Sequence, residues 1–167
     1  MGKSNGGTRK SRSNSPKGLS NTSTIEAEIA SIKADFVSGR EEAIADIKAY
    51  RAQGKVGQMV NAEIDRAIEQ AENALRLYES VNSVQEVNEV DDKVGTELKR
   101  IASRLDDMAR THQANANDAT GRVKNTSERA ASALYMAAHN VRNASNYAPN
   151  SILARLWELY RSQNKWL

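Results

Sequence analysis

The chain has 167 residues, a formal net charge of +3 and no cysteine, which excludes disulfide bonds and thiolate metal sites. This length suits one domain with a tail. The longest apolar run spans residues 133–138, whereas a membrane span needs about 18 or more apolar residues, and the N-terminus lacks the apolar stretch of a secretory signal. We therefore expect a soluble, cytoplasmic protein and no membrane partner.

The charge is distributed unevenly along the chain. Residues 1–24 carry five basic and no acidic side chains, residues 25–121 carry 12 basic and 19 acidic ones, and residues 122–167 carry seven basic and two acidic ones. Ile, Leu, Val and Phe together number only 30, and no segment alternates apolar and polar residues as a strand does. The composition favours an all-α protein, either an elongated bundle of thin, closely packed helices or an oligomer, over a thick globular core.

A disordered basic tail is predicted over residues 1–23, because this Gly-, Ser- and Asn-rich segment has too little apolar surface to offset the entropy of ordering. Cations on such a segment attract polyanions by releasing counterions, without sequence preference. Nucleic acid is therefore a candidate partner, and a tail that only increases solubility is the alternative. The candidate nucleic-acid-binding residues are Lys3, Arg9, Lys10, Arg12 and Lys17.

The first residues of the chain read MGKSNGGTR. They resemble the N-termini of uncharacterised phage-derived or mobile-element proteins from gut bacteria. The resemblance covers only the tail, and no functional residue can be transferred from it. It implies a bacterial or phage accessory protein and implies nothing about mechanism.

The first helix is predicted to begin at Thr24, which can cap the amides that follow. Apolar residues recur at helical spacing on one face: Ile25, Ile29, Ile32, Phe36, Ala43, Ile47 and Tyr50. Ser38 and Glu41 have the spacing of a capping box, so this segment is either one continuous helix or two helices with a kink at Gly39. Two glycines within residues 53–57 predict a turn.

The second helix is predicted over residues 58–80, and it ends before Ser83, which has capping-box spacing with Glu86. The third helix carries the strongest pattern in the chain, more than three heptads typical of a coiled-coil seam or a long bundle helix. The seam residues are Val84, Val87, Asp91, Val94, Leu98, Ile101, Leu105, Met108 and His112. A buried carboxylate is costly unless it is paired. Either Asp91 finds a cation, or the helix packs properly only from Val94 onward, and we favour the second interpretation.

The helical domain, residues 24–167, changes character after its acidic, heptad-like part, residues 24–112. Residues 113–124 contain few large apolar side chains and a glycine, and we predict a loop there. Basic C-terminal helices then cover residues 125–167. The first of them presents small residues on one face, which would let a partner helix approach closely. Pro149 ends it, because proline disfavours helix in the residue before it.

Aromatic side chains concentrate in the last helix, which is predicted to begin at Asn150 or Ser151 and holds both tryptophans of the chain. Aromatic residues are favoured at the centres of protein interfaces. This helix either closes the bundle core, or docks on a partner or a second copy, or lies on a membrane surface. The candidate partner-interface residues are Leu153, Leu156, Trp157, Tyr160 and Trp166.

No metalloprotease or dinucleotide-binding motif points to catalysis, and His112 and His139 have no acidic partner at metal-ligand spacing. We therefore expect no enzyme, no cofactor and no metal site. The leading hypothesis is a helical assembly or adaptor protein that binds other protein chains or itself as an oligomer. The alternative is a nucleic-acid-associated accessory protein that uses the basic tail and the basic C-terminal region on phosphates.

Overall fold

The computed structural model of the chain describes the backbone of residues 17–52 and 58–164 and the side chains of residues 24–51 and 59–163. Within these ranges the protein is all-α and contains no strand. The α-helices are α1 (Lys17–Ala52), α2 (Asn61–Leu75), α3 (Val84–Asn117), α4 (Gly121–Ser145) and α5 (Asn150–Asn164), and the short 3-10 helices η2 (Gln58–Val60) and η3 (Arg76–Ser80) flank α2.

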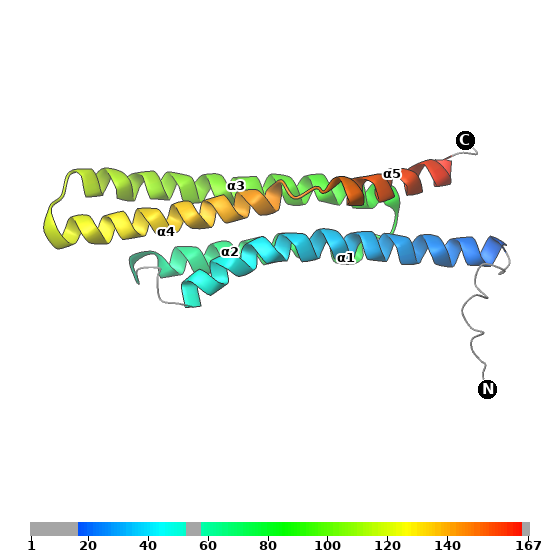
Figure 1. The fold of residues 1–167 in the computed structure, drawn as a ribbon, viewed down its shortest axis with the longest axis horizontal. Coiled ribbons are helices and arrows are strands. Elements are labelled where there is room, and N and C mark those ends of the chain that lie inside the picture. The colour runs from blue at the N-terminus through cyan, green and yellow to red at the C-terminus, as the bar shows by residue number, and fades with distance from the viewer. Residues whose placement is uncertain (1–16, 53–57, 165–167) are drawn as a thin grey trace, which may run out of the picture.

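The helices form an elongated bundle (Figure 1). α3 and α4 run antiparallel as a long hairpin, and α1 and α2 lie along one side of it. α5 follows α4 and contacts both α1 and α3. The start of α1 and the whole of α5 therefore share one end of the molecule, and the turn between α3 and α4 forms the opposite end. The predicted all-α, elongated helical bundle is confirmed.

Small side chains at heptad spacing hold the α3–α4 hairpin together. Fully buried alanines recur at every seventh position: Ala102, Ala109 and Ala116 on α3, and Ala130, Ala137 and Ala144 on α4. Gly95 continues the series on α3, and a Cβ built there would lie 3.4 Å from the carbonyl oxygen of Ser145. Side chains this small let two helix backbones approach closely. The prediction that the small-residue face admits a close partner helix is confirmed, and that partner is α3.

α1 differs from its prediction at its N-terminus. It begins at Lys17, before the predicted start at Thr24, and residues 1–16 of the predicted tail lie outside the described residues. The kink considered at Gly39 does not interrupt the helix, because α1 continues through this position. The buried face of the helix includes Phe36, Arg40 and Ile44. Packing along this face therefore keeps the helix in one piece, and packing generally contributes more to helix stability than local signals do.

The helical structure is interrupted between η3 and α3, as predicted. Ser83 is extended and caps α3: its Oγ accepts a hydrogen bond from the amide of Glu86 at 3.1 Å, and Glu86 Oε1 accepts one from the amide of Ser83 at 3.2 Å. Glu86 also accepts a hydrogen bond from the amide of Asn82, and this contact is the largest cause that lowers the pKa of its carboxyl group. The capping box predicted from Ser83 and Glu86 is confirmed. The predicted turn at residues 53–57 lies outside the described residues.

The predicted loop at residues 113–124 is wrong for most of its length. α3 continues to Asn117 and α4 already begins at Gly121, whose φ of 63° is accessible to glycine without strain. The basic C-terminal helices therefore start before residue 125. The segment looks polar in the sequence because close packing of the hairpin needs only a small residue here, and Ala116 supplies it in a buried position.

Candidate protein-binding surface

α5 has apolar side chains on two faces. Ile152, Leu156 and Leu159 are buried against the bundle, whereas Leu153, Trp157 and Tyr160 are 40%, 57% and 45% exposed. Leu156, also predicted as an interface residue, is 7% exposed and belongs to the core. Trp166 lies outside the described residues. The last helix therefore helps to close the core and also presents a second apolar face to solvent.

The three exposed side chains, which we call the α5 stripe, lie along two turns of the helix. The rings of Trp157 and Tyr160 stack with their centroids 5.5 Å apart and their planes 14° apart. The stripe borders a groove of about 740 Å³ against the first turns of α3, where Gln85, Asn88 and Glu89 form the opposite wall. Val84 and Leu156 also line this groove. The combination is an apolar floor beside a polar wall.

One arginine fixes the opposite side of α5 to α1. Arg155 donates hydrogen bonds from Nε to Glu28 at 3.1 Å, from one terminal nitrogen to Asp35 at 2.5 Å, and from the other to Ser31 Oγ at 2.7 Å. The bond to Asp35, followed by the bond to Glu28, raises the pKa of the Arg155 guanidinium. These contacts join residues more than a hundred positions apart in the chain, so they set how α5 lies on α1 and which face it turns outward.

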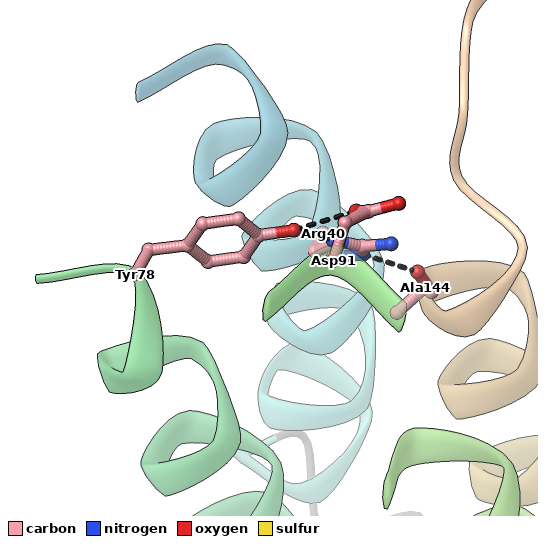
Figure 2. A network of polar contacts seen from close by, with 4 residues as sticks. All are labelled: Arg40, Tyr78, Asp91 and Ala144. Atoms are coloured by element: carbon pink, nitrogen blue, oxygen red, sulfur yellow. Dashed lines mark hydrogen bonds and ion pairs between the residues drawn. The ribbon is translucent and has the colours of Figure 1, made fainter. Parts of the chain in front are cut away.

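A buried polar cluster, which we call the Arg40 cluster, lies where α1 meets the last turn of α4, just before the connection to α5 (Figure 2). Arg40 is 1% exposed, and its Nε donates a hydrogen bond of 2.9 Å to the carbonyl oxygen of Ala144 in the last turn of α4. Its Nη1 forms an ion pair of 2.7 Å with Asp91 and a hydrogen bond with the hydroxyl group of Tyr78. The hydroxyl of Tyr78 donates to Asp91 at 2.6 Å. One guanidinium thus connects α1, η3, α3 and α4.

The Arg40 cluster answers the question that the sequence raised about Asp91. Asp91 does find a cation, and the interpretation that we favoured, packing only from Val94 onward, is wrong because Val84, Val87 and Val90 are all buried. Burial, followed by the hydrogen bond to Asp91, raises the pKa of Tyr78 well above its usual value. The phenol therefore stays neutral and remains a donor. Members of the cluster satisfy one another, which indicates a role in holding helices together.

Gly39, the neighbour of Arg40, receives the connection between α4 and α5. A Cβ built on Gly39 would overlap the ring of Tyr147, so only glycine at this position lets the ring lie against α1. Gly39 and Arg40 together hold the turn from Ala144 to Tyr147 against α1, and this turn determines where α5 starts. The sequence analysis missed both roles. One signal was available: Arg40 lies four residues after Phe36 and four before Ile44, in line with the apolar face of α1.

The other sequence candidates do not assemble into a site. His112 is half-buried with a buried Nδ1 that has no hydrogen-bond partner, and the exposed His139 contacts Asn143 at 3.3 Å. Among the described residues, no group of His, Cys, Asp and Glu side chains could hold a metal ion. None of the described helices has both the length and the apolar character needed to cross a membrane.

The basic residues of the nucleic-acid hypothesis are not placed by the structure. Lys3, Arg9, Lys10 and Arg12 lie outside the described residues, and Lys17 is described only as the first backbone position of α1. This hypothesis therefore stays a prediction.

Comparison of the chain with protein-family models, with curated proteins and with solved structures found no match. The function proposed below therefore rests on the contacts described above.

Proposed function

We propose that this protein is a non-catalytic helical adaptor that binds a segment of another protein chain on the α5 stripe. The observation that carries the proposal is the exposure of Leu153, Trp157 and Tyr160 side by side along a groove. The fold does not require these three side chains for packing, because Ile152, Leu156 and Leu159 already attach α5 to the core. Contiguous exposed apolar side chains rimmed by polar ones are typical of interaction sites.

The composition of the stripe also supports binding to protein. Tyrosine and tryptophan are among the residues that contribute most to protein interfaces, because they bring a large contact area at a small cost in side-chain entropy. Arg161 lies over the ring of Trp157 at 6.0 Å and pairs with Glu158 at 3.3 Å. These contacts restrain the indole ring in the free protein, which lowers the entropic cost of binding.

The proposal is tested by selecting peptides from a random library displayed on phage against the immobilised full chain. Selected peptides are then measured against two variants, Trp157→Ala in the stripe and Tyr135→Ala as a matched control. Tyr135 is 39% exposed and lies on α4, away from the groove. We expect peptides that bind the unaltered chain and the control equally and that lose about tenfold or more in affinity with Trp157→Ala. Peptides that bind all three proteins equally would refute the proposal.

A further inference from the structure

We infer that the α5 stripe accepts a helical, positively charged segment of its partner, an inference that rests on the proposed function and specifies the chemistry of the ligand. Three observations lead to it: the shape of the groove, the charge of its wall, and the size of the exposed apolar area. Each of them excludes other occupants.

The shape of the groove indicates a helix. Leu153, Trp157 and Tyr160 stand at positions i, i+4 and i+7, so the apolar floor follows α5 for two turns. The wall on α3 runs beside it, with Gln85, Asn88 and Glu89. An amphipathic helix lays its own i, i+4 and i+7 side chains into a groove of this kind.

The wall of the groove carries one carboxylate, that of Glu89. The first turns of α3, residues 84–92, contain four carboxylates and no Lys or Arg. Asp91 is neutralised by Arg40, and Glu86 serves the capping box. Glu89 lines the groove, accepts a hydrogen bond from Gln85 and forms no ion pair with another described residue, whereas Asp92, one turn later, lines a separate pocket beside α2. Since the nearby Arg161 is paired with Glu158, the rim attracts a ligand that carries Lys or Arg.

The exposed area is too small for a second copy of this chain. From the usual surface areas of such side chains and their exposed fractions, the stripe presents roughly 300 Å². A stable protein–protein interface buries about 800 Å² per partner. A single short helix therefore fits the stripe better than a second bundle does. The N-terminal residues 1–16 fit less well, because they carry cations but no Leu, Ile, Val, Phe, Trp or Tyr to occupy the apolar floor.

The test uses two synthetic helical peptides that share the same Leu and Trp residues at i, i+4 and i+7. Their remaining positions are filled with Lys in one peptide and with Glu in the other. Binding of each labelled peptide to the full chain is measured by fluorescence anisotropy at low and high salt. We expect the Lys peptide to bind about tenfold or more tightly than the Glu peptide at low salt, and salt to reduce the difference.

Two variants separate specific binding from general attraction between charges. Trp157→Ala removes the floor, and we expect it to weaken binding of the Lys peptide about tenfold. Glu89→Lys reverses the charge of the wall, and we expect it to weaken binding of the Lys peptide and to strengthen binding of the Glu peptide. The Tyr135→Ala control leaves both affinities unchanged.

The outcomes distinguish this inference from the proposed function. If both peptides bind equally and both need Trp157, the proposed function stands and the charge preference is wrong. If the Lys peptide binds as well to Trp157→Ala, its binding is general charge attraction, and the inference fails. If light scattering shows a dimer that Trp157→Ala dissociates, or if removal of residues 1–16 alone increases the affinity for both peptides, the occupant is a second copy or the tail, and the inference is overturned.

Discussion

The α3–α4 hairpin and α5 both bury apolar side chains against neighbouring helices, but the hairpin uses small side chains and α5 uses large ones. The hairpin uses alanines that are completely buried, and its helices lie so close that a Cβ at Gly95 would touch the backbone of α4. α5 uses large residues, and only one of its two apolar faces is covered. Small residues are completely buried once two helices meet, whereas the aromatic residues of α5 leave an exposed apolar surface that the fold does not need. The comparison therefore supports the proposal that binding takes place at α5, while the hairpin is closely packed.

The largest effect on stability is expected at the Arg40 cluster, which lies where the hairpin connects to α5. Replacing Arg40 by Ala removes the cation of the partly buried Asp91, which keeps only the hydroxyl of Tyr78, and removes the side-chain donor to the carbonyl group of Ala144; such a loss costs about 3 kcal/mol of unfolding free energy. Urea unfolding followed by circular dichroism measures it. Asp91→Asn, which keeps a hydrogen-bond acceptor, should cost less than Arg40→Ala. Equal stability of Arg40→Ala and the unaltered chain would mean that the cluster does not hold the helices together.

A smaller loss is expected when the close approach in the hairpin is disturbed. Ala137→Leu places extra methyl groups between α3 and α4, where Ala137 is fully buried, and overpacking of this kind costs about 1–3 kcal/mol. The matched control is Ser132→Leu, an equally large side chain at an exposed position of the same helix. If both variants unfold at the same urea concentration, the hairpin is less tightly packed than the heptad alanines indicate.

The capping box of α3 should contribute about 1 kcal/mol, because Ser83→Ala leaves a helix amide without its acceptor. Its pH dependence follows from Glu86, whose pKa is lower in the folded chain than in the unfolded chain. This contribution is therefore present above the usual pKa of glutamate and is lost as the pH falls through the lowered value. Comparison of thermal unfolding of Glu86→Gln and the unaltered chain from neutral to acidic pH measures it. Parallel curves over that range would contradict the assignment.

The smallest effect on stability is expected in the α5 stripe itself. Trp157 is more than half exposed, so Trp157→Ala should change the unfolding free energy by about 0.5 kcal/mol or less while it removes binding. Ile152→Ala in the same helix should do the reverse and cost about 2 kcal/mol or more, because Ile152 is buried and does not line the groove. The two positions of α5 would thus separate binding from folding. A large loss of stability with Trp157→Ala would assign the indole to the core.

Several elements were predictable because their causes are local. The break before α3 follows from Ser83 and Glu86, and the start of α5 after Pro149 follows from the restricted backbone at proline, so both match the structure. The kink considered in α1 and most of the predicted loop between α3 and α4 are absent for one reason. In both places a local signal, glycine in one and polar composition in the other, is overridden by contacts with a distant helix.

The candidate site shows the same division. The sequence analysis named Leu153, Leu156, Trp157 and Tyr160 as candidate interface residues of the last helix, but it did not separate buried from exposed members. That separation depends on how α5 rotates against α1, which the contacts of Arg155 with Glu28, Ser31 and Asp35 decide.

By itself the sequence determined the helical class, the ends of helices marked by caps and proline, and the heptad pattern of α3, because these depend on residues within a few turns of one another. Only the tertiary structure decided that Arg40 pairs with Asp91 and that Gly39 receives Tyr147, and it alone showed which side of α5 remains uncovered. The reason is physical: burial and charge pairing join residues far apart in the chain, and no local pattern specifies which distant side chains meet.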